Sequence, residues 1–254
     1  MKTKIIFEDK HILVIQKPAG LATQTARVDQ QDVVSELKNH LAGAPYLGIV
    51  HRLDQPVEGL LIFGKNKSAT ASLAAQLGHQ DKDGTLNKRY YCVICGKVPA
   101  KDGQLVDYLY KDVYVTGNAI VMSADAAKQN PRAKLASLQY HILQKKEIVI
   151  EKNHIEQDAD KPSSVWLSLA DIQIDTGRFH QIRAQMAHSG MCLLGDGRYG
   201  DDHARKISEQ LGIRGAALCA YSLEFVHPVS KKKMHFQIKP EGLGFSFFSY
   251  INQL

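Results

Sequence analysis

The sequence predicts an α+β fold around a mixed, mainly antiparallel sheet with flanking helices. Short apolar runs rich in β-branched residues recur along the chain, and turn-forming residues end them. Only a few helical patterns lie between these runs, without a regular strand–helix–strand alternation. The 254 residues, 44% of them hydrophobic, can bury a substantial core. We therefore expect one domain over residues 1–254.

The first third of the chain alternates short strands with two helices. Apolar spacing and turn formers predict, in order, two strands within residues 5–20, a helix over 32–43, strands over 47–50 and 59–65, and a helix over 68–80. The opening strands join at Asp9-Lys10. Asn66 or Ser68 would cap the second helix.

The rest of the chain is predicted to be strands with one clear helix. Strands are expected over residues 87–98, 134–143, 165–174, 219–228 and 233–240, and the helix over 178–190. The polar stretch over residues 144–164 contributes little to a core, so it is predicted to be an inserted loop.

The charge balance favours a polyanionic partner. Lys and Arg number 32 against 26 Asp and Glu, and the pI is about 9.0. Lys and Glu interrupt the apolar residues at the start before a signal-peptide core can form, and no run approaches the roughly 18 apolar residues of a membrane span. We therefore predict a cytoplasmic protein without a membrane partner.

The run His51-Arg52-Leu53-Asp54 places charge between two apolar segments. A carboxylate on a turn between buried strands loses water at a cost unless a cation offsets that loss. Asp54 therefore belongs either to an active-site turn or to a surface turn, where it would form a local ion pair or an Asx turn. This segment alone leaves both interpretations open.

A second candidate site is "DTGRFHQIRAQMAHSG". Thr176-Gly177 can start a helix whose first turns carry His180, Gln181 and Arg183. Backbone N–H groups at a helix start suit phosphate, and the planar Arg fork suits a carboxylate. The alternative is an amphipathic helix with a solvated basic face.

The third candidate is "GDGRYG" over residues 195–200, whose residue types match the dinucleotide-binding pattern G-x-G-x-x-G. Its structural context does not match. That pattern needs a preceding strand and a helix that starts within it, whereas here a helix is expected before it and acidic "DDHARK" follows. We reject the dinucleotide interpretation. A glycine-supported loop that carries Asp196, Arg198 and Tyr199 stays possible.

No metal site is expected. Cys92 and Cys95 form a C-x-x-C, but they lie in a strand-like run, where residues three apart face opposite ways. No second cysteine pair and no histidine motif of a metal site occurs in the sequence.

Six segments, in this order, resemble the RluA-type family of RNA pseudouridine synthases. They are "EDKHILVIQKPAGLATQ", "HRLDQPVEGLLIF", "KRYYCVICG", "DTGRFHQIRAQMAHSG", "LLGDGRYG" and "AYSLEFVHPVSKK". The likeness covers most of the chain, and the segments together are highly specific. It implies the pseudouridine synthase fold with a catalytic cleft. It also implies isomerisation of specific uridines in structured rRNA or tRNA without a cofactor or metal.

The resemblance also implies residue roles. Asp54 would be the nucleophile that breaks the N1–C1′ bond, after which the uracil turns and rejoins through C5. Tyr90 would stack on the flipped base, and Arg183 would pair with Asp54. Arg52 would fill the gap that the base leaves. The other implied RNA contacts are His51, Lys88, Arg178, His180 and Gln181.

Several positions depart from the family pattern. Val57-Glu58 replace a common Thr-Ser, and Gln185, Met191-Cys192 and Cys219 replace frequent His, His-Pro and His. None belongs to the implied catalytic set, so we expect catalysis but leave target choice open. The pattern begins within the first ten residues, so no N-terminal S4 domain is expected. RNA recognition would then rest on this domain or a partner.

Two other functions compete with the synthase. One is a non-catalytic RNA-binding module or RNA chaperone, which would not require an Asp beside anionic RNA. The other is a small-nucleoside hydrolase, which would not require a basic exterior. The presence of Asp54, Tyr90 and Arg183 together favours the enzyme. We further expect a monomer that does not bind DNA.

Overall fold

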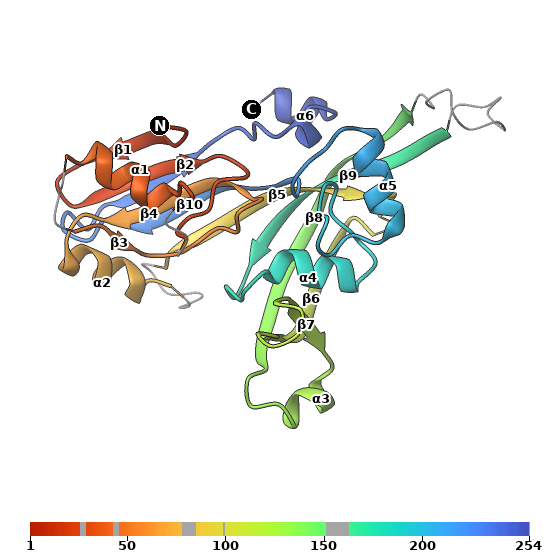
Figure 1. Ribbon diagram of the computed structural model, residues 1–254, viewed down its shortest axis with the longest axis horizontal. Coiled ribbons are helices and arrows are strands. Elements are labelled where there is room, and N and C mark those ends of the chain that lie inside the picture. The colour runs from red at the N-terminus through yellow and green to blue at the C-terminus, as the bar shows by residue number, and fades with distance from the viewer. Residues whose placement is uncertain (26–28, 43–45, 78–84, 99, 151–162, 254) are drawn as a thin grey trace. The chain divides into compact units, whose positions relative to one another are not determined.

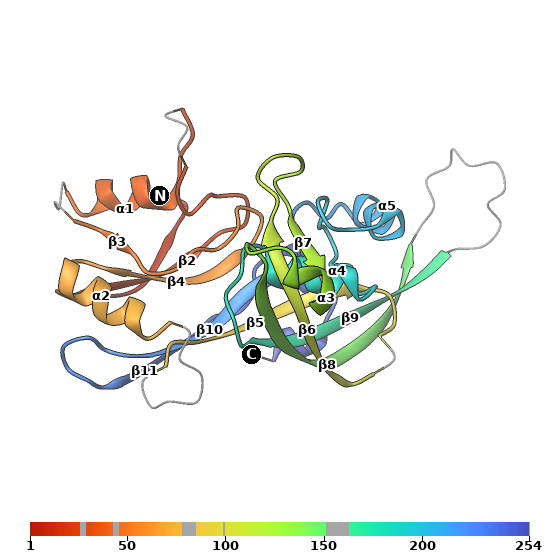
Figure 2. The ribbon, with the colours of Figure 1, turned by 90° about the horizontal axis from the view of Figure 1, so that it is seen from below.

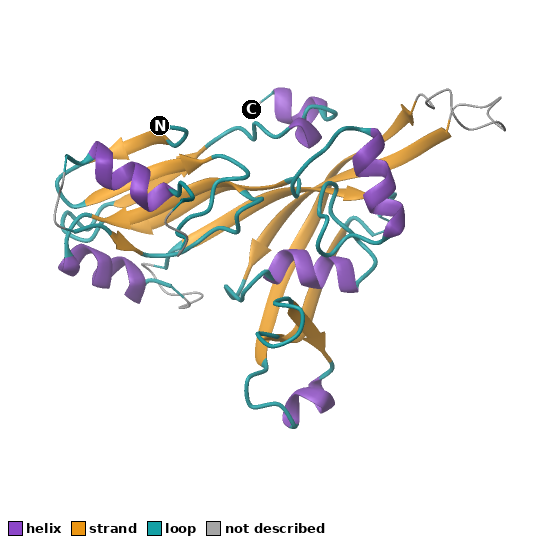
Figure 3. Cartoon of the chain, in the orientation of Figure 1, coloured by secondary structure: helices purple, strands orange, loops and turns teal. Residues whose placement is uncertain are grey.

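The computed structural model describes residues 1–25, 29–42, 46–77, 85–98, 100–150 and 163–253. It confirms an α+β fold, since strands predominate and a smaller number of helices flank them (Figure 3). The chain divides into two compact units, residues 1–90 with 219–241 and residues 91–218 with 242–254 (Figure 1). The expectation of a single catalytic domain stays a prediction.

The first unit contains a mixed sheet. Its strands are β1 (Lys4–Glu8), β2 (Ile12–Lys17), β3 (Gly48–Ile49), β4 (Glu58–Gly64), β10 (Leu218–Val226) and β11 (Lys233–Gln237). Their order is β1-β2-β4-β10, with β3 paired to β4 and β11 paired to β10. The predicted opening hairpin is confirmed, because Asp9 Oδ1 accepts the N–H groups of His11 and Ile12 at its turn.

Helices α1 (Val33–His40) and α2 (Lys67–Ala75) belong to this unit. Asp32 caps α1 by accepting the Ser35 N–H at 2.7 Å, and Asn66 caps α2 by accepting the Ala69 N–H at 2.8 Å. The prediction that Asn66 caps the second helix is therefore confirmed. Gly43, expected just past the first helix, lies outside the described residues. Leu73 of α2 is fully buried in an apolar cluster with residues of β2, β4 and β10.

Strands β4 and β10 run parallel at the start of β4, where Gly59 lies opposite Ala220. The φ of Gly59 is +135°, and a Cβ there would lie 2.5 Å from the Ala220 backbone nitrogen. Only glycine fits this close approach. This close approach brings β10 directly beside the segment that follows Asp54.

The second unit contains a mainly antiparallel sheet. Its strands are β5 (Asn87–Cys95) from Tyr91 onward, β6 (Asp102–Lys111), β7 (Ala119–Met122), β8 (Lys134–Ile150) and β9 (Ser163–Ile174), in the order β5-β9-β8-β6-β7. Strands β6 and β7 were not predicted, because β6 alternates exposed and half-buried residues instead of forming an apolar run. Strand β8 continues to Ile150, which corrects the first part of the expected loop 144–164. Residues 151–162 lie outside the description.

The helical elements of the second unit are α3 (Ala124–Lys128), α4 (Gln181–His188), α5 (Asp202–Gln210), η1 (Leu243–Phe245) and α6 (Ser249–Asn252). Figure 2 shows α4 lying alongside β6 and β7. Helix α4 begins at Gln181 and not at Thr176-Gly177, so that expectation was wrong. Helix α5 was not predicted, although Asp201 caps it by accepting the Ala204 N–H.

No helix in the described part of the chain is long and apolar enough to cross a membrane.

Candidate active site

The turn that carries Asp54 is hydrogen-bonded on both sides to the segment that follows β2. Before Asp54, the Leu53 N–H donates to Thr23 Oγ1 at 3.2 Å, and the Thr23 hydroxyl donates to the Leu53 carbonyl at 2.8 Å. After Asp54, the Gly20 N–H donates to the Gln55 carbonyl at 2.8 Å. Within the turn, the Val57 N–H donates to the Asp54 carbonyl at 3.1 Å. These bonds fix the backbone that presents the Asp54 carboxylate.

Lys17 joins the same two segments from inside the protein. Its side chain is fully buried, and its ammonium donates to the carbonyls of Leu21, Pro18 and Gln55 at 2.6, 2.9 and 3.1 Å. An ammonium has three N–H donors, so these acceptors match its full capacity. Burial lowers the Lys17 pKa to about 8, although the charges of Asp54 and Glu58 oppose that shift.

Tyr90, at the end of the first unit's part of β5, is buried and lies within the electrostatic reach of Asp54. Burial raises the pKa of the Tyr90 hydroxyl well above its ordinary value, and the Asp54 charge raises it further. The hydroxyl is therefore neutral across the physiological range. The first unit thus brings together two members of the predicted catalytic set, a carboxylate and a neutral aromatic ring.

His51 and Lys88 form a second polar pair in this unit. His51 is 8% exposed, and neither ring nitrogen has a hydrogen-bond partner among the residues that the structure describes. Burial lowers the His51 pKa well below its ordinary value, and the Lys88 charge lowers it further. Burial also lowers the Lys88 pKa to about 8. At neutral pH the pair is therefore a neutral imidazole beside an ammonium.

Arg52 and Glu58 flank the turn in different environments. Arg52 is exposed, and its Nη2 donates to Gln24 Oε1 at 3.1 Å. Glu58, one of the departures from the family pattern, is buried, and its Oε2 accepts the Glu241 N–H at 3.1 Å. Its register partner across β4 and β10 is Cys219, another departure. The longer Glu side chain thus lies opposite a small one.

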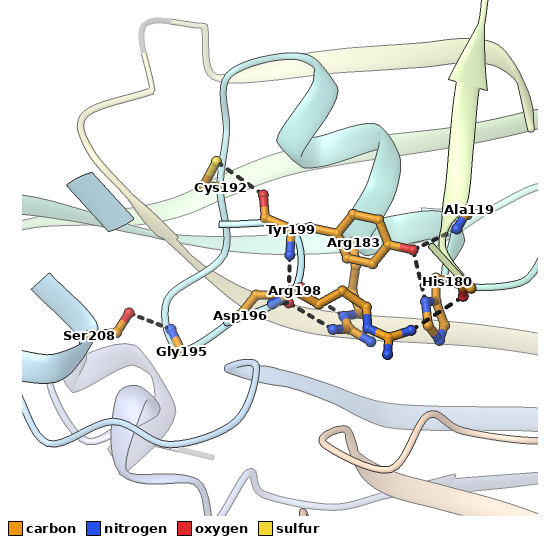
Figure 4. Close-up of polar contacts among 10 residues, drawn as sticks. Ala119, His180, Arg183, Cys192, Gly195, Asp196, Arg198, Tyr199 and Ser208 are labelled. Carbon is orange, nitrogen blue, oxygen red and sulfur yellow. Dashed lines mark hydrogen bonds and ion pairs between the residues drawn. The ribbon is translucent and has the colours of Figure 1, made fainter. Parts of the chain in front are cut away.

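In the second unit, Arg183 makes a buried ion pair with Asp196. Arg183 Nε donates to Asp196 Oδ2 and Nη2 donates to Oδ1, both at 2.7 Å (Figure 4). Both side chains are at most 5% exposed. Burial opposes ionisation of Asp196, but hydrogen bonds and charge from Arg183 outweigh it and hold the Asp196 pKa below its ordinary value. The sequence did not predict this partner.

His180 and Tyr199 lie beside that ion pair. His180 precedes α4 in the left-handed conformation, with φ 52°, and its Nδ1 lies 2.9 Å from the Tyr199 hydroxyl. The same hydroxyl accepts the Ala119 N–H of β7 at 2.8 Å (Figure 4). The Arg183 guanidinium lies 5.1 Å from the centre of the Tyr199 ring. The loop expected from "GDGRYG" therefore contributes both Asp196 and Tyr199.

The other predicted RNA contacts near α4 make protein contacts. Gln181 is buried, and its Oε1 accepts the Thr176 hydroxyl at 2.7 Å and the Arg178 N–H at 2.9 Å. Arg178 is exposed, and its Nε donates to the Leu135 carbonyl. Gln185, a departure in the family pattern, is fully buried, and its amide nitrogen lies 2.7 Å from Asp107 Oδ2. Gln181 thus orders the start of α4.

Three residues at these sites were missed by sequence reasoning. Lys17 could have been found as a lysine that ends a strand beginning with an apolar run, because a charge there requires compensation. Thr23 gave no sequence signal. Asp196 was noted only as a loop residue, because its partner lies 13 positions earlier on another element.

The four cysteines are free and buried. Burial raises the thiol pKa of Cys92, and it raises that of Cys219 well above the ordinary value. Such thiols are poor nucleophiles at neutral pH. No group of three or more His, Cys, Asp or Glu side chains in the described ranges could hold a metal ion.

Asp196→Asn should destabilise the second unit by about 3 kcal/mol, because it leaves the buried Arg183 charge without its carboxylate. Urea unfolding followed by fluorescence of Trp166, the single tryptophan, reports on this unit. The matched control is Asp202→Asn, at an exposed Asp–Arg pair, which should change stability by less than about 0.5 kcal/mol.

The lowered pKa of Asp196 determines how the stability of the second unit changes with pH. Because the folded-state pKa of Asp196 is lowered, its contribution is present above the ordinary Asp pKa and is lost as pH falls through the lowered one. The wild type and Asp196→Asn should therefore converge in strong acid. Equal losses of stability in Asp196→Asn and Asp202→Asn would contradict the structural importance of the buried pair.

Residues 11–188 match the family model described as RNA pseudouridylate synthase. The chain is 32% identical over 245 residues to the ribosomal large subunit pseudouridine synthase D of Zymomonas mobilis, covering 92% of this chain and 68% of the relative. It is 30% identical to synthase C of Vibrio cholerae, covering 91% of this chain and 63% of that protein. The tRNA pseudouridine synthase C of Vibrio cholerae is 25% identical, with 91% and 88% covered. The chain thus spans about two thirds of these ribosomal relatives.

Solved structures show the same fold. Human RNA Pseudouridylate Synthase Domain Containing 1 matches with a TM-score of 0.69 at 17% identity, covering 97% of this chain and 86% of that one. Human RNA Pseudouridylate Synthase Domain Containing 4 matches with a TM-score of 0.63 at 18% identity, covering 98% and 92%. The family model and the sequence relatives show that the chain belongs to the RluA-type family of RNA pseudouridylate synthases.

Proposed function

We propose that this protein isomerises specific uridines in structured rRNA or tRNA, with Asp54 as the nucleophile and without a cofactor. The observation that carries the proposal is the turn that carries Asp54, because its hydrogen bonds to neighbouring segments hold Asp54 near the neutral ring of Tyr90. The relatives named for ribosomal and transfer RNA support both RNA classes as substrates.

The reaction needs no net change in atoms or electrons. The N1–C1′ bond of uridine breaks, the uracil turns while it is held, and a C5–C1′ bond forms. The proton that C5 carried is lost to the surroundings, and N1 of the product takes up a proton. In this scheme Asp54 supplies electron density as the first bond breaks, and a fixed carboxylate lowers the entropic part of the barrier.

Uridine in folded RNA must leave its stack before a carboxylate can reach it, at a cost of about a few kcal/mol. Arg52 is suited to fill the gap, because its side chain is exposed beside Asp54. Tyr90 is suited to stack on the flipped base, since its ring stays neutral and flat aromatic rings stack well on bases. His51 and Lys88 would contact the sugar or phosphate.

Arg183 is proposed to pair with Asp54, as the family resemblance implies. Its bidentate contact with Asp196 fixes the plane of the guanidinium and uses two of the five N–H donors. A guanidinium held in this way is preorganised for a second carboxylate. Arg178, His180 and Gln181 are proposed to contribute to RNA binding around the start of α4.

Asp54→Asn should lower turnover by at least about 1,000-fold while the protein stays folded and binds RNA. RNA affinity should persist because it rests mainly on cations. The test incubates each protein with total RNA from cells that lack this gene and maps new pseudouridines by carbodiimide-dependent primer-extension stops. Filter binding and circular dichroism measure affinity and folding.

Stops that appear with the wild type alone would support the reaction and identify the target. RNA binding by the wild type without new stops would instead favour a non-catalytic RNA-binding module. Misfolding of both Asp54→Asn and Asp54→Ala would indicate that Asp54 serves the structure of the turn.

Arg183→Met should lower the single-turnover rate by about 10-fold or more, because the proposed cation beside Asp54 is lost. Trp166 fluorescence would show whether the second unit remains folded, and Asp202→Asn again provides the surface control. A folded Arg183→Met protein with the wild-type rate would rule out the proposed pairing with Asp54.

A further inference from the structure

The loop between β6 and β7 exposes three consecutive apolar residues. Val113, Tyr114 and Val115 are 54%, 83% and 87% exposed. The loop projects beyond the ends of the two strands (Figure 2). Single apolar side chains are common on protein surfaces, but a run of three on an exposed loop is typical of a contact surface. The isomerisation proposed above uses none of these residues.

Asp112 fixes the backbone of this loop. Its Oδ1 accepts the N–H groups of Tyr114 and Val115, both at 3.2 Å, and its Oδ2 accepts the N–H and the hydroxyl of Thr116, both at 2.9 Å. These hydrogen bonds, above all that from the Thr116 N–H, hold the Asp112 pKa below its ordinary value. The Asp112 N–H donates to the Asn118 carbonyl at 2.8 Å. Tyr114 is therefore presented by an ordered backbone, which lowers the entropic cost of a contact through its side chain.

The Arg132 guanidinium lies over the Tyr114 ring. Its central carbon is 5.5 Å from the centre of that ring and 5.7 Å from the centre of the Tyr110 ring. Both distances are typical of cation–π contacts. Because Tyr114 is so exposed, the contact leaves most of its ring surface in solvent. A flat ring with a cation on one side is suited to receive a nucleic-acid base on the other.

The charges around the loop favour RNA over an apolar protein surface. Lys111 directly precedes the loop, Arg132 lies over Tyr114, and Arg198 Nη1 donates to the Gly117 carbonyl at 3.3 Å. All three of these cations are exposed. Asp112 is the single acidic residue of the loop, and its oxygens accept the hydrogen bonds of the loop itself. RNA phosphates would compensate these cations, whereas an apolar partner would bury them without compensation.

We propose that Tyr114 is a stacking platform for an unpaired base of the RNA substrate, with Arg132 supporting the ring from the opposite side. This base is not the flipped uridine, for which Tyr90 is proposed. Every base has a flat π-face, so the contact adds affinity without selecting a sequence. This inference rests on the proposed function, because it names a further RNA contact of the same enzyme.

The test compares the RNA affinities of full-chain variants by filter binding at one low salt concentration. The probes are a stem-loop RNA with unpaired uridines and a fully paired RNA duplex of the same length. Tyr114→Ala should weaken stem-loop binding about 10-fold or more, because a stacked ring is lost, and should leave duplex binding unchanged. Tyr114→Phe keeps the ring and should bind both probes like the wild type. Val115→Ala, the matched control on the same loop, should also bind like the wild type.

The fluorescence of Tyr114→Trp gives a direct readout of stacking. The wild type has one tryptophan, Trp166, so the added emission of the variant comes from position 114. Stem-loop RNA should quench this added emission, because a stacked base contacts the indole ring. The paired duplex should not quench it.

Equal stem-loop affinities of Tyr114→Ala and the wild type would overturn the inference and leave the proposed function intact. Equal losses in Tyr114→Ala and Val115→Ala would also overturn it, because they would indicate a general apolar contact, as with a protein partner, and not stacking. Absence of RNA binding by the wild type would refute the proposed function itself and this inference with it.

Discussion

The buried ammonium of Lys17 is the constraint on which the Asp54 turn depends. A cation without water is costly, and here the carbonyls of Leu21, Pro18 and Gln55 replace its hydration. Because one of these acceptors directly follows Asp54, the hydrogen bonds that satisfy the charge also fix the turn. The carboxylate is thus presented by rigid backbone, as the proposed role of Asp54 as a nucleophile would require.

In the second unit a different pair of buried charges also fixes the local geometry. Buried Asp196 orients Arg183, and it also accepts the backbone N–H groups of Arg198 and Tyr199. One carboxylate therefore orders both a guanidinium and the loop that carries the Tyr199 hydroxyl. In both units a buried charge costs folding free energy and gives a fixed geometry in return.

Much of the fold could be predicted, because buried strands such as β2 and β4 are continuous apolar runs. Strand β6 was missed, since it alternates exposed and half-buried residues and forms no apolar run, and α5 was missed because it lies in a charged segment. Asp54 and Tyr90 were proposed as site residues through the resemblance, whereas Lys17 was not. Periodicity does not reveal partners that are distant in sequence, so the Arg183–Asp196 pair also required the structure.

The most direct test of the account is the single-turnover release of tritium from RNA labelled at C5 of uridine, by the wild type and by Asp54→Glu. Glutamate keeps the charge but moves the carboxylate by one methylene. If the hydrogen-bonded turn fixes the position of the reacting carboxylate, the rate of tritium release should be about 100-fold or more lower for Asp54→Glu than for the wild type. Comparable rates in the two proteins, or no release by a wild type that binds RNA, would contradict the account.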